Sequence, residues 1–169
     1  VNTPVYRGST ILANSSKSFR EKDLRYFYGS QSNPTTEALE NSIMELDNAD
    51  SCKITSSGRT AILLALLSFV SNGDHIILSD NVYDPTRQIA NNFLTKMGVQ
   101  VSYFDPLDLE TLKNTIRKNT VAIFFESPGS LTFEIVDIRK LMKIAKENNI
   151  YTIMDNTWAT PLFFKPYDF

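Results

Sequence analysis

The sequence contains a single cysteine, Cys52, and a single histidine, His75, in 169 residues. One cysteine cannot form an intrachain disulfide, and a reducing compartment is then the default expectation. With one residue of each type, no Cys/His metal cluster can be assembled within the chain, so we expect no metal, and a Ser-His-Asp triad would have to use His75. Cys52 lies in a short apolar run, which favours a small buried hydrophobe over a nucleophile. His75 opens an expected strand, at the end away from the candidate ligand site, which favours a structural role.

Long apolar runs and an excess of charge of one sign are also missing. The most apolar stretch, Ala61 to Val70, is far shorter than the ~20 residues that cross a bilayer, and no secretory signal is visible. The net charge is −2, with basic residues scattered among acidic ones, whereas nucleic-acid binders usually carry a basic face. We therefore expect a cytoplasmic protein that binds neither a membrane nor a nucleic acid.

What the sequence does have is an alternation of short apolar strands with helices of ten to fifteen residues. This alternation predicts an α/β fold with a mostly parallel sheet flanked by helices. The continuously apolar strands predict that both faces of the sheet are covered. The expected strands are 51–55, 75–78, 99–104, 121–125 and 150–154, and the expected helices after the first are 59–71, 85–97, 109–117 and 138–148.

The beginning of the chain differs from this pattern. Residues 1–32 show no sustained period and contain Pro4, Gly8 and Gly29, so we expect an extended arm rather than a packed element. Asn33-Pro34 then marks the start of a helix, because Asn favours the cap and Pro is pre-set for the first turn. The sequence therefore predicts an N-terminal arm, 1–32, and an α/β domain, 33–169.

Ligands of parallel α/β sheets bind beyond the carboxyl ends of the strands, so the residues after each strand are the candidates. The turn Ser57-Gly58-Arg59 leads into a helix, whose free N–H groups and dipole favour an anion, although a plain capped turn is about as common. It is neither a dinucleotide nor a Walker motif. Tyr83 follows the next strand and could stack on a planar ligand or be an ordinary loop tyrosine. Asp155 ends the last strand, where it could pair with a cationic ligand group or form an Asx turn.

Taken together, these segments resemble the Cys/Met-metabolism family of pyridoxal-phosphate (PLP) enzymes along the whole chain. The resemblance rests on the joint occurrence of several motifs in order. They are the opening Val1-Asn2-Thr3-Pro4-Val5-Tyr6, the segment Tyr28-Gly29-Ser30-Gln31-Ser32-Asn33-Pro34-Thr35, the phosphate turn Ser57-Gly58, the stacking tyrosine Tyr83 and the triplet Asp155-Asn156-Thr157.

The resemblance implies a PLP-transferase fold type I large domain, here incomplete, with pyridoxal 5′-phosphate as cofactor. The family's pattern implies that Asp155 pairs with the protonated ring nitrogen and that Tyr83 lies over the ring. It further implies that Ser57, Gly58 and Arg59 hold the phosphate and that Thr157 supports the ring from its other side. Tyr83 and Tyr28 are the implied catalytic residues. Tyr28 reaches the neighbouring subunit's site in the family, so a homodimer or homotetramer is implied.

Two details are most similar to the β-lyase branch of the family. Glu126-Ser127-Pro128-Gly129-Ser130 has Ser130 near a position where synthases and γ-lyases more often have Asn, and Trp158 stands where those relatives usually carry Phe. The branch implies α,β-elimination of cystathionine, or a related sulfur amino acid, to homocysteine, pyruvate and ammonia. A cystathionine γ-synthase or γ-lyase is the alternative within the family. Residues 126–130 also form a turn at the end of an expected strand, well placed for a pocket wall, and turn chemistry from Pro and Gly is the alternative explanation.

Three departures from the family pattern bear on activity. The family's Schiff-base lysine is expected beyond Phe169, so the chain is expected to be truncated before it and to be inactive alone. Without that lysine, the α-proton lacks its general base. Ser30 replaces a usual arginine, and Arg59, where methionine is common, could restore the charge. A non-catalytic truncated remnant is therefore a further alternative.

Overall fold

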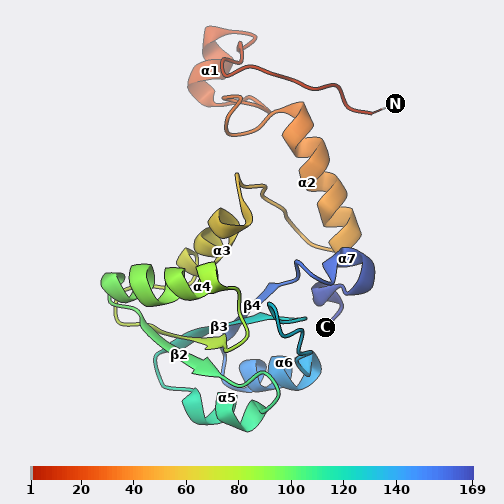
Figure 1. Cartoon of the computed structure of the whole chain (residues 1–169). Coiled ribbons are helices and arrows are strands. Elements are labelled where there is room, and N and C mark those ends of the chain that lie inside the picture. Colours follow the sequence, from red (N-terminus) through yellow and green to blue (C-terminus); the bar gives the residue numbers. More distant parts are fainter. Residues whose placement is uncertain (1) are drawn as a thin grey trace. The chain divides into compact units, whose positions relative to one another are not determined.

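The structure, a computed structural model, describes residues 2–169, and Val1 lies outside the described residues. The chain divides into two compact units, one ending at Ile54 and the other spanning Thr55–Phe169 (Figure 1). The division falls after Ile54, whereas the sequence suggested an arm that ends at residue 32. The helix that follows the arm thus belongs to the first compact unit, and the assignment of 33–169 to one cofactor-binding domain stays a prediction.

The first unit contains two helices, α1 (Ser16–Glu21) and α2 (Pro34–Asp47). The start of α2 confirms the capping prediction, because the Asn33 side chain accepts hydrogen bonds from the amides of Thr35 and Thr36. The helix α1 was not expected. It forms because Ser15 and Ser18 cap its first turn reciprocally in a capping box.

The second unit is built on a four-stranded parallel sheet, which confirms the predicted fold class. Its strands are β1 (His75–Ser79), β2 (Gln100–Phe104), β3 (Thr120–Glu126) and β4 (Tyr151–Asp155), in the order β2-β1-β3-β4. The prediction of a strand at 51–55 is wrong. Lys53 pairs there with Glu40, and the amide of Ile54 donates to the same carboxylate, so the segment bonds to a side chain instead of a neighbouring strand.

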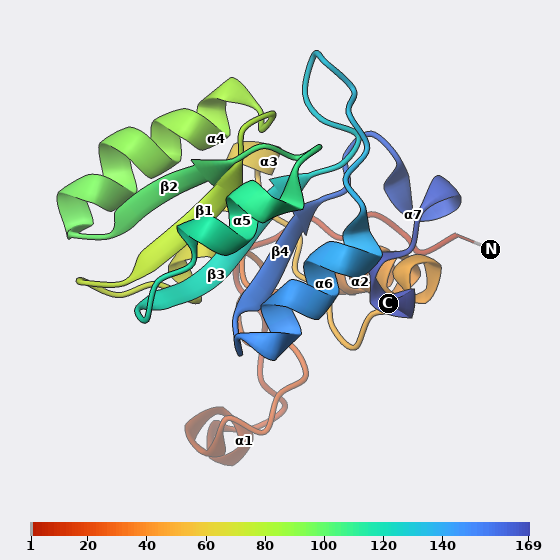
Figure 2. The same ribbon diagram turned by 90° about the horizontal axis from the view of Figure 1, so that it is seen from below.

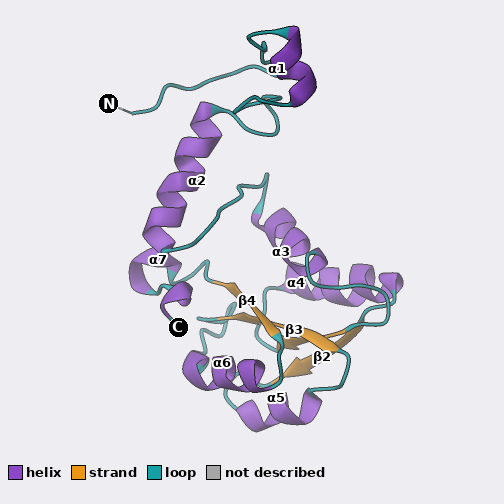
Figure 3. Cartoon of the chain, turned by 180° about the vertical axis from the view of Figure 1, so that it is seen from behind, coloured by secondary structure: helices purple, strands orange, loops and turns teal. Residues whose placement is uncertain are grey.

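Helices cover both faces of the sheet. Figure 3 shows α3 (Gly58–Leu67) and α4 (Asp84–Gln88) on one face and α5 (Leu109–Thr115) and α6 (Ile138–Glu147) on the other. Successive strand residues alternate between the two layers, as a pleated strand requires. Ile76 and Leu78 of β1 pack in a core cluster with Leu66 of α3, whereas Ile77 packs with Leu112 and Leu141 of α5 and α6.

The helix expected at 85–97 is three consecutive segments. After α4 the chain forms a π-helix, η1 (Ile89–Leu94), and a short 3₁₀ turn, η2 (Thr95–Met97). At the end of η1 the amide of Thr95 donates to the carbonyl of Ala90, five residues earlier. The wider turn brings Ile89, Ala90 and Leu94 to the core side together, although an α-helix would turn Ile89 and Leu94 about 140° apart. The chain ends with α7 (Thr160–Phe163) and η3 (Pro166–Asp168).

The connections between strands diverge at one edge of the sheet. The chain leaves β1 over the face covered by α4 and leaves β3 over the opposite face, covered by α6 (Figure 2). Adjacent strands whose connections diverge in this way form a topological switch point, where α/β proteins bind ligands. Ser79 ends β1 and Glu126 ends β3, so both residues lie at this point.

Candidate functional site

The start of α3 lies at the same edge of the sheet as the ends of the strands. The Phe69 ring, just after α3, contacts the Tyr151 ring at the first residue of β4, with centroids 4.8 Å apart. Ile62 and Leu66 of α3 share a core cluster with Ile153 of β4. Since the end of α3 meets the beginning of β4, the helix runs against the strand. Its first residues therefore lie toward the carboxyl ends of the strands.

The predicted phosphate turn, Ser57-Gly58-Arg59, is a capped helix start with accessible backbone. The Ser57 hydroxyl accepts from the amide of Thr60, at 3.2 Å, which occupies one of the free N–H groups of the first turn. A side-chain carbon built on Gly58 would meet nothing within 4 Å, so the remaining backbone there is open. Open amides at the start of a ten-residue helix, with hydroxyls and the Arg59 guanidinium beside them, suit a phosphate.

This turn also opens onto a groove of about 450 Å³ on the side of α4 and η1. Neither Tyr83 nor Asp155 lines that groove, so it does not join the three candidate positions in one hollow. It is lined by Ser57, Arg59, Thr60, Leu63, Gln88, Ile89, Asn92, Phe93 and Lys96.

Asp155 is the half-buried last residue of β4, and its carboxylate is oriented by Thr157. Both the amide and the hydroxyl of Thr157 donate to Asp155 Oδ1, at 3.0 and 2.5 Å. The Asx turn that was the alternative reading of this segment is thus present. It does not compete with a ligand role, because it holds one carboxylate oxygen and fixes the direction of the other. The hydrogen bonds from Thr157 to Asp155 are part of the structure, whereas the roles of both residues toward a cofactor stay predictions.

Tyr83 precedes α4 with its ring half exposed and its backbone held by a buried acid. Its amide donates to Glu126 Oε2 at 2.8 Å, and no side chain caps α4 at Tyr83 itself. Glu126 pairs in register with Asp155 across β3 and β4. The backbone of Tyr83 and the two carboxyls therefore lie together at the carboxyl edge of the sheet.

Glu126 begins the turn that the sequence placed at a pocket wall, but it was not among the predicted site residues. Burial raises its pKa to about 7, the Tyr83 amide opposes this rise, and the nearby Asp155 carboxylate adds to it. A raised pKa beside a second carboxyl at a strand end is typical of functional sites. The signal was available in the sequence, since Glu126 ends a buried strand as Asp155 does, and the cost of burying a carboxylate applies to both.

The remaining candidates belong to other segments of the chain. Tyr28 belongs to the first compact unit, where it pairs in an isolated antiparallel bridge with Thr10. Cys52 is half-buried, and burial raises the pKa of its thiol, which agrees with a structural residue. His75 is fully buried and its ring nitrogens bond to the hydroxyls of Thr120 and Ser102, at 2.8 and 2.9 Å, which confirms its structural role.

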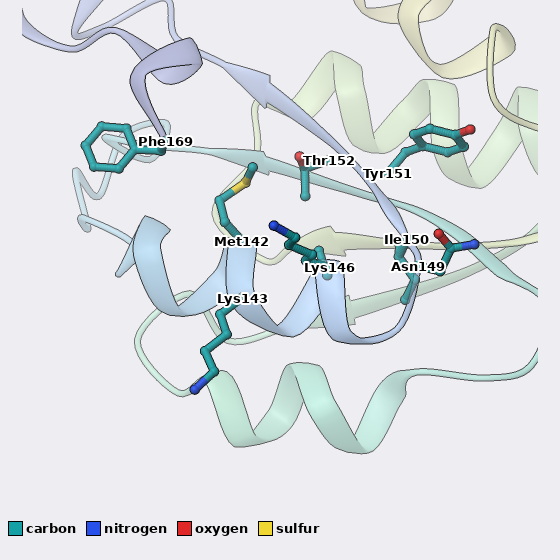
Figure 4. A pocket seen from close by; sticks show the side chains of 9 residues that line it. Met142, Lys143, Lys146, Asn149, Ile150, Tyr151, Thr152 and Phe169 are labelled. Atoms are coloured by element: carbon teal, nitrogen blue, oxygen red, sulfur yellow. The ribbon is translucent and has the colours of Figure 1, made fainter.

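A separate groove of about 500 Å³ lies along the outer flank of α6 and β4 (Figure 4). Lys143 and Lys146 come from α6 and Thr152 from β4, and Phe169 closes one end. None of the predicted site residues lines this groove. It is a feature of the sheet margin and not of the switch point.

Two kinds of feature are missing from residues 2–169. Within this range, no group of three or more His, Cys, Asp and Glu side chains is arranged to hold a metal ion. Among the helices of the same range, none combines the length and the apolar character that a membrane crossing needs.

A parallel sheet with helices on both faces, and an open helix start at the edge where a carboxylate ends β4, is the arrangement of PLP-dependent enzymes of fold type I. A model of the family described as Cys/Met metabolism PLP-dependent enzymes matches residues 1–169, and the chain belongs to this family. The residues present fit the cofactor, because open helix amides, the exposed ring of Tyr83 and an oriented carboxylate share one edge of the sheet.

Individual relatives agree with this assignment. The chain is 43% identical over 164 residues to a Saccharomyces cerevisiae protein named "Putative cystathionine beta-lyase", covering 97% of this chain and 48% of that one. It is 38% identical to a cystathionine beta-lyase of Lactococcus lactis subsp. cremoris, covering 98% and 42%. The crystal structure of cystathionine gamma-lyase from Lactobacillus plantarum, complexed with L-serine, superposes with a TM-score of 0.89 at 31% identity, covering 98% and 42%. The chain thus spans less than half the length of these relatives.

Proposed function

We propose that the protein is a PLP-dependent carbon–sulfur lyase that cleaves cystathionine, or a related sulfur amino acid, by α,β-elimination. The observation that carries the proposal is that an open helix start and an oriented Asp155 both lie at the carboxyl edge of one sheet, in a chain of this family. The names of two relatives and the identities of Ser130 and Trp158 favour the β-lyase branch.

The balanced reaction consumes water. Cystathionine loses its α-proton, its Cβ–S bond breaks, and homocysteine leaves with the sulfur electron pair and a proton. The remaining three-carbon fragment is hydrolysed to pyruvate and ammonia. When bound, PLP supplies an electron sink for the carbanion left by proton loss.

The residues of this chain supply binding and charge. The amides of Gly58 and Arg59 at the start of α3 hold the phosphate, and the Arg59 guanidinium adds a positive charge beside it. The Asp155 carboxylate, oriented by Thr157, accepts a hydrogen bond from the ring N–H and favours its protonated form. The Tyr83 ring covers one face of the cofactor.

Assembly and location are part of the proposal. In a homodimer or homotetramer, Tyr28 of one subunit completes the neighbouring subunit's site, as the family resemblance implies. A single cysteine, without an intrachain disulfide, suits the cytoplasm. Sedimentation of the protein with and without PLP tests the assembly, and a stable monomer in both conditions contradicts it.

The activity test is an assay of the protein as its gene encodes it, with PLP and cystathionine. Pyruvate and free homocysteine are the expected products. Release of α-ketobutyrate and cysteine instead assigns the protein to the γ-lyases. Neither product, together with no cofactor absorbance near the Schiff-base band, identifies a non-catalytic remnant.

Substitution of Asp155 tests the proposed role of its carboxylate directly in this assay. Asp155→Ala is expected to lower kcat/KM by roughly a hundredfold or more, because it removes a fixed charge from a site that works by electrostatic preorganisation. Asp168→Ala, on the exposed η3 segment, is the matched control and is expected to keep wild-type activity. Equal activity of the wild type and the Asp155 variant contradicts the role of Asp155.

A further inference from the structure

Glu126 connects three strands of the sheet at the switch point. Its backbone N–H donates to the Ser79 hydroxyl at the end of β1, at 3.2 Å. Within the sheet, Glu126 pairs in register with Asp155 at the end of β4. Glu126 is nevertheless nearly inaccessible to solvent, with 3% of its surface exposed. A carboxyl in such a place is costly unless it has a specific partner.

The specific partner is the backbone amide of Tyr83. Glu126 Oε2 accepts from this N–H at 2.8 Å, and the bond spans 43 residues of sequence. Hydrogen bonds between a backbone N–H and an ionised acceptor are roughly twice as strong as neutral ones. Because no side chain caps α4 at Tyr83, this bond holds the point at which the chain turns from the loop after β1 into the helix.

The loop that carries Tyr83 has a second, independent attachment nearby. The amide of Ser130 donates to the carbonyl of Asn81 at 2.9 Å, so the turn after β3 also holds the loop after β1. This second bond holds the backbone of Asn81, whereas the backbone amide of Tyr83 is held by Glu126. The two attachments can be separated by experiment, because they use different atoms of different residues.

We propose that Glu126 is a positioning residue, which sets Tyr83 at a fixed place relative to Asp155 by binding the Tyr83 amide from the strand next to Asp155. The functional part of this inference rests on the proposed function, in which Tyr83 covers a ring whose nitrogen Asp155 holds. Glu126 touches neither ring nor substrate in this role. It acts through the backbone of Tyr83.

The test is amide hydrogen exchange, measured by NMR at pH 8 on the cofactor-free protein. Glu126→Leu removes the acceptor and is expected to speed exchange of the Tyr83 amide at least tenfold. Glu126→Gln keeps the shape and a neutral acceptor, and is expected to speed it about threefold. The Ser130 amide is the internal control and is expected to keep its wild-type rate in both variants.

Two results overturn the proposal. One is an unchanged Tyr83 rate in the Gln variant, a readout that remains if the Leu variant does not fold. The other is an equal rise at Tyr83 and Ser130, which indicates general loosening of the edge. Titration of PLP into the wild type and the same variants separates failure of the positioning role from failure of the proposed function. If exchange changes as expected and PLP never binds the wild type, the positioning role stands and the proposed function fails.

Discussion

His75 shows how a titratable side chain can serve the fold alone. The imidazole starts β1 and bridges the hydroxyl of Ser102 on β2 and that of Thr120 on β3, so one ring joins three strands. Burial lowers its pKa to about 4, and the positive charge of Arg117 contributes in the same direction. The folded protein therefore keeps this ring neutral over most of the acid range.

The stability of the protein should fall on acidification because of this ring. Between pH 6.5 and about 4, His75 is protonated in the unfolded chain but stays neutral in the folded chain. The free energy of unfolding therefore decreases as pH falls through this range. The loss approaches about 3 kcal/mol when complete. Urea unfolding of the wild type and His75→Gln at pH 7.5 and pH 4.5 measures it. Parallel losses in the two proteins would show that His75 does not contribute.

Glu126 should act in the opposite direction. Its pKa is raised to about 7, so from about pH 4.5 to 7 the folded state holds a proton that the unfolded state has released. Its contribution therefore makes the free energy of unfolding decrease as pH rises through this range. Glu126→Gln removes this contribution. Between pH 5 and pH 8 the free energy of unfolding of the variant should therefore rise by up to about 3 kcal/mol relative to that of the wild type. A difference between the two proteins that is independent of pH contradicts the raised pKa.

The backbone of Leu131, in the loop after β3, is strained in a way that a glycine would relieve. Leu131 has φ = 67° and is 87% exposed, so its side chain makes little contact while its backbone occupies the left-handed region. A non-glycine residue pays roughly 1–2 kcal/mol there. Leu131→Gly should therefore leave the melting temperature unchanged or raise it. Leu107→Gly, at another exposed loop position with φ outside this region, should lower stability by about 0.5–1 kcal/mol.

Elements with strong local signals could be predicted from the sequence. The strands β1 to β4 are short apolar runs between turn residues, and α2 carries its cap in Asn33 and Pro34. The strand at 51–55 could not be judged, because whether Lys53 faces a strand or the carboxylate of Glu40 depends on packing between residues far apart in the chain. The π-helix at 89–94 also follows from packing, since three side chains compete for one core face.

The candidate site was predictable where one rule connects sequence and position. Parallel strands bring their carboxyl ends to one edge, so the order of strands and helices along the chain is enough to place Asp155 and the Tyr83 loop there. Glu126 was overlooked because its turn invited a reading in terms of Pro128 and Gly129. The groove beside Arg59 depends on how α3 meets η1, which no local pattern specifies.

At the scale of the whole molecule, two cores on the two faces of one sheet hold the second unit together. Leu66 of α3 is fully buried in one of them, whereas Leu64 of the same helix is half exposed. Leu66→Ala should cost about 2–5 kcal/mol of unfolding free energy, since it leaves a cavity as well as losing apolar contact. Leu64→Ala, with the same change of atoms and helix propensity, should cost less than about 1 kcal/mol. Chemical denaturation of both measures the difference, and equal losses would contradict the described packing.

The single imidazole also gives the molecule a built-in spectroscopic reporter. With one histidine in the chain, the ring protons give one isolated pair of resonances, and their chemical shift distinguishes neutral from charged rings. At pH 5.5 the folded sheet keeps His75 neutral, while an opened chain protonates it. A one-dimensional proton spectrum recorded during a thermal ramp would therefore count the molecules in which β1 has separated from its neighbours, without any label.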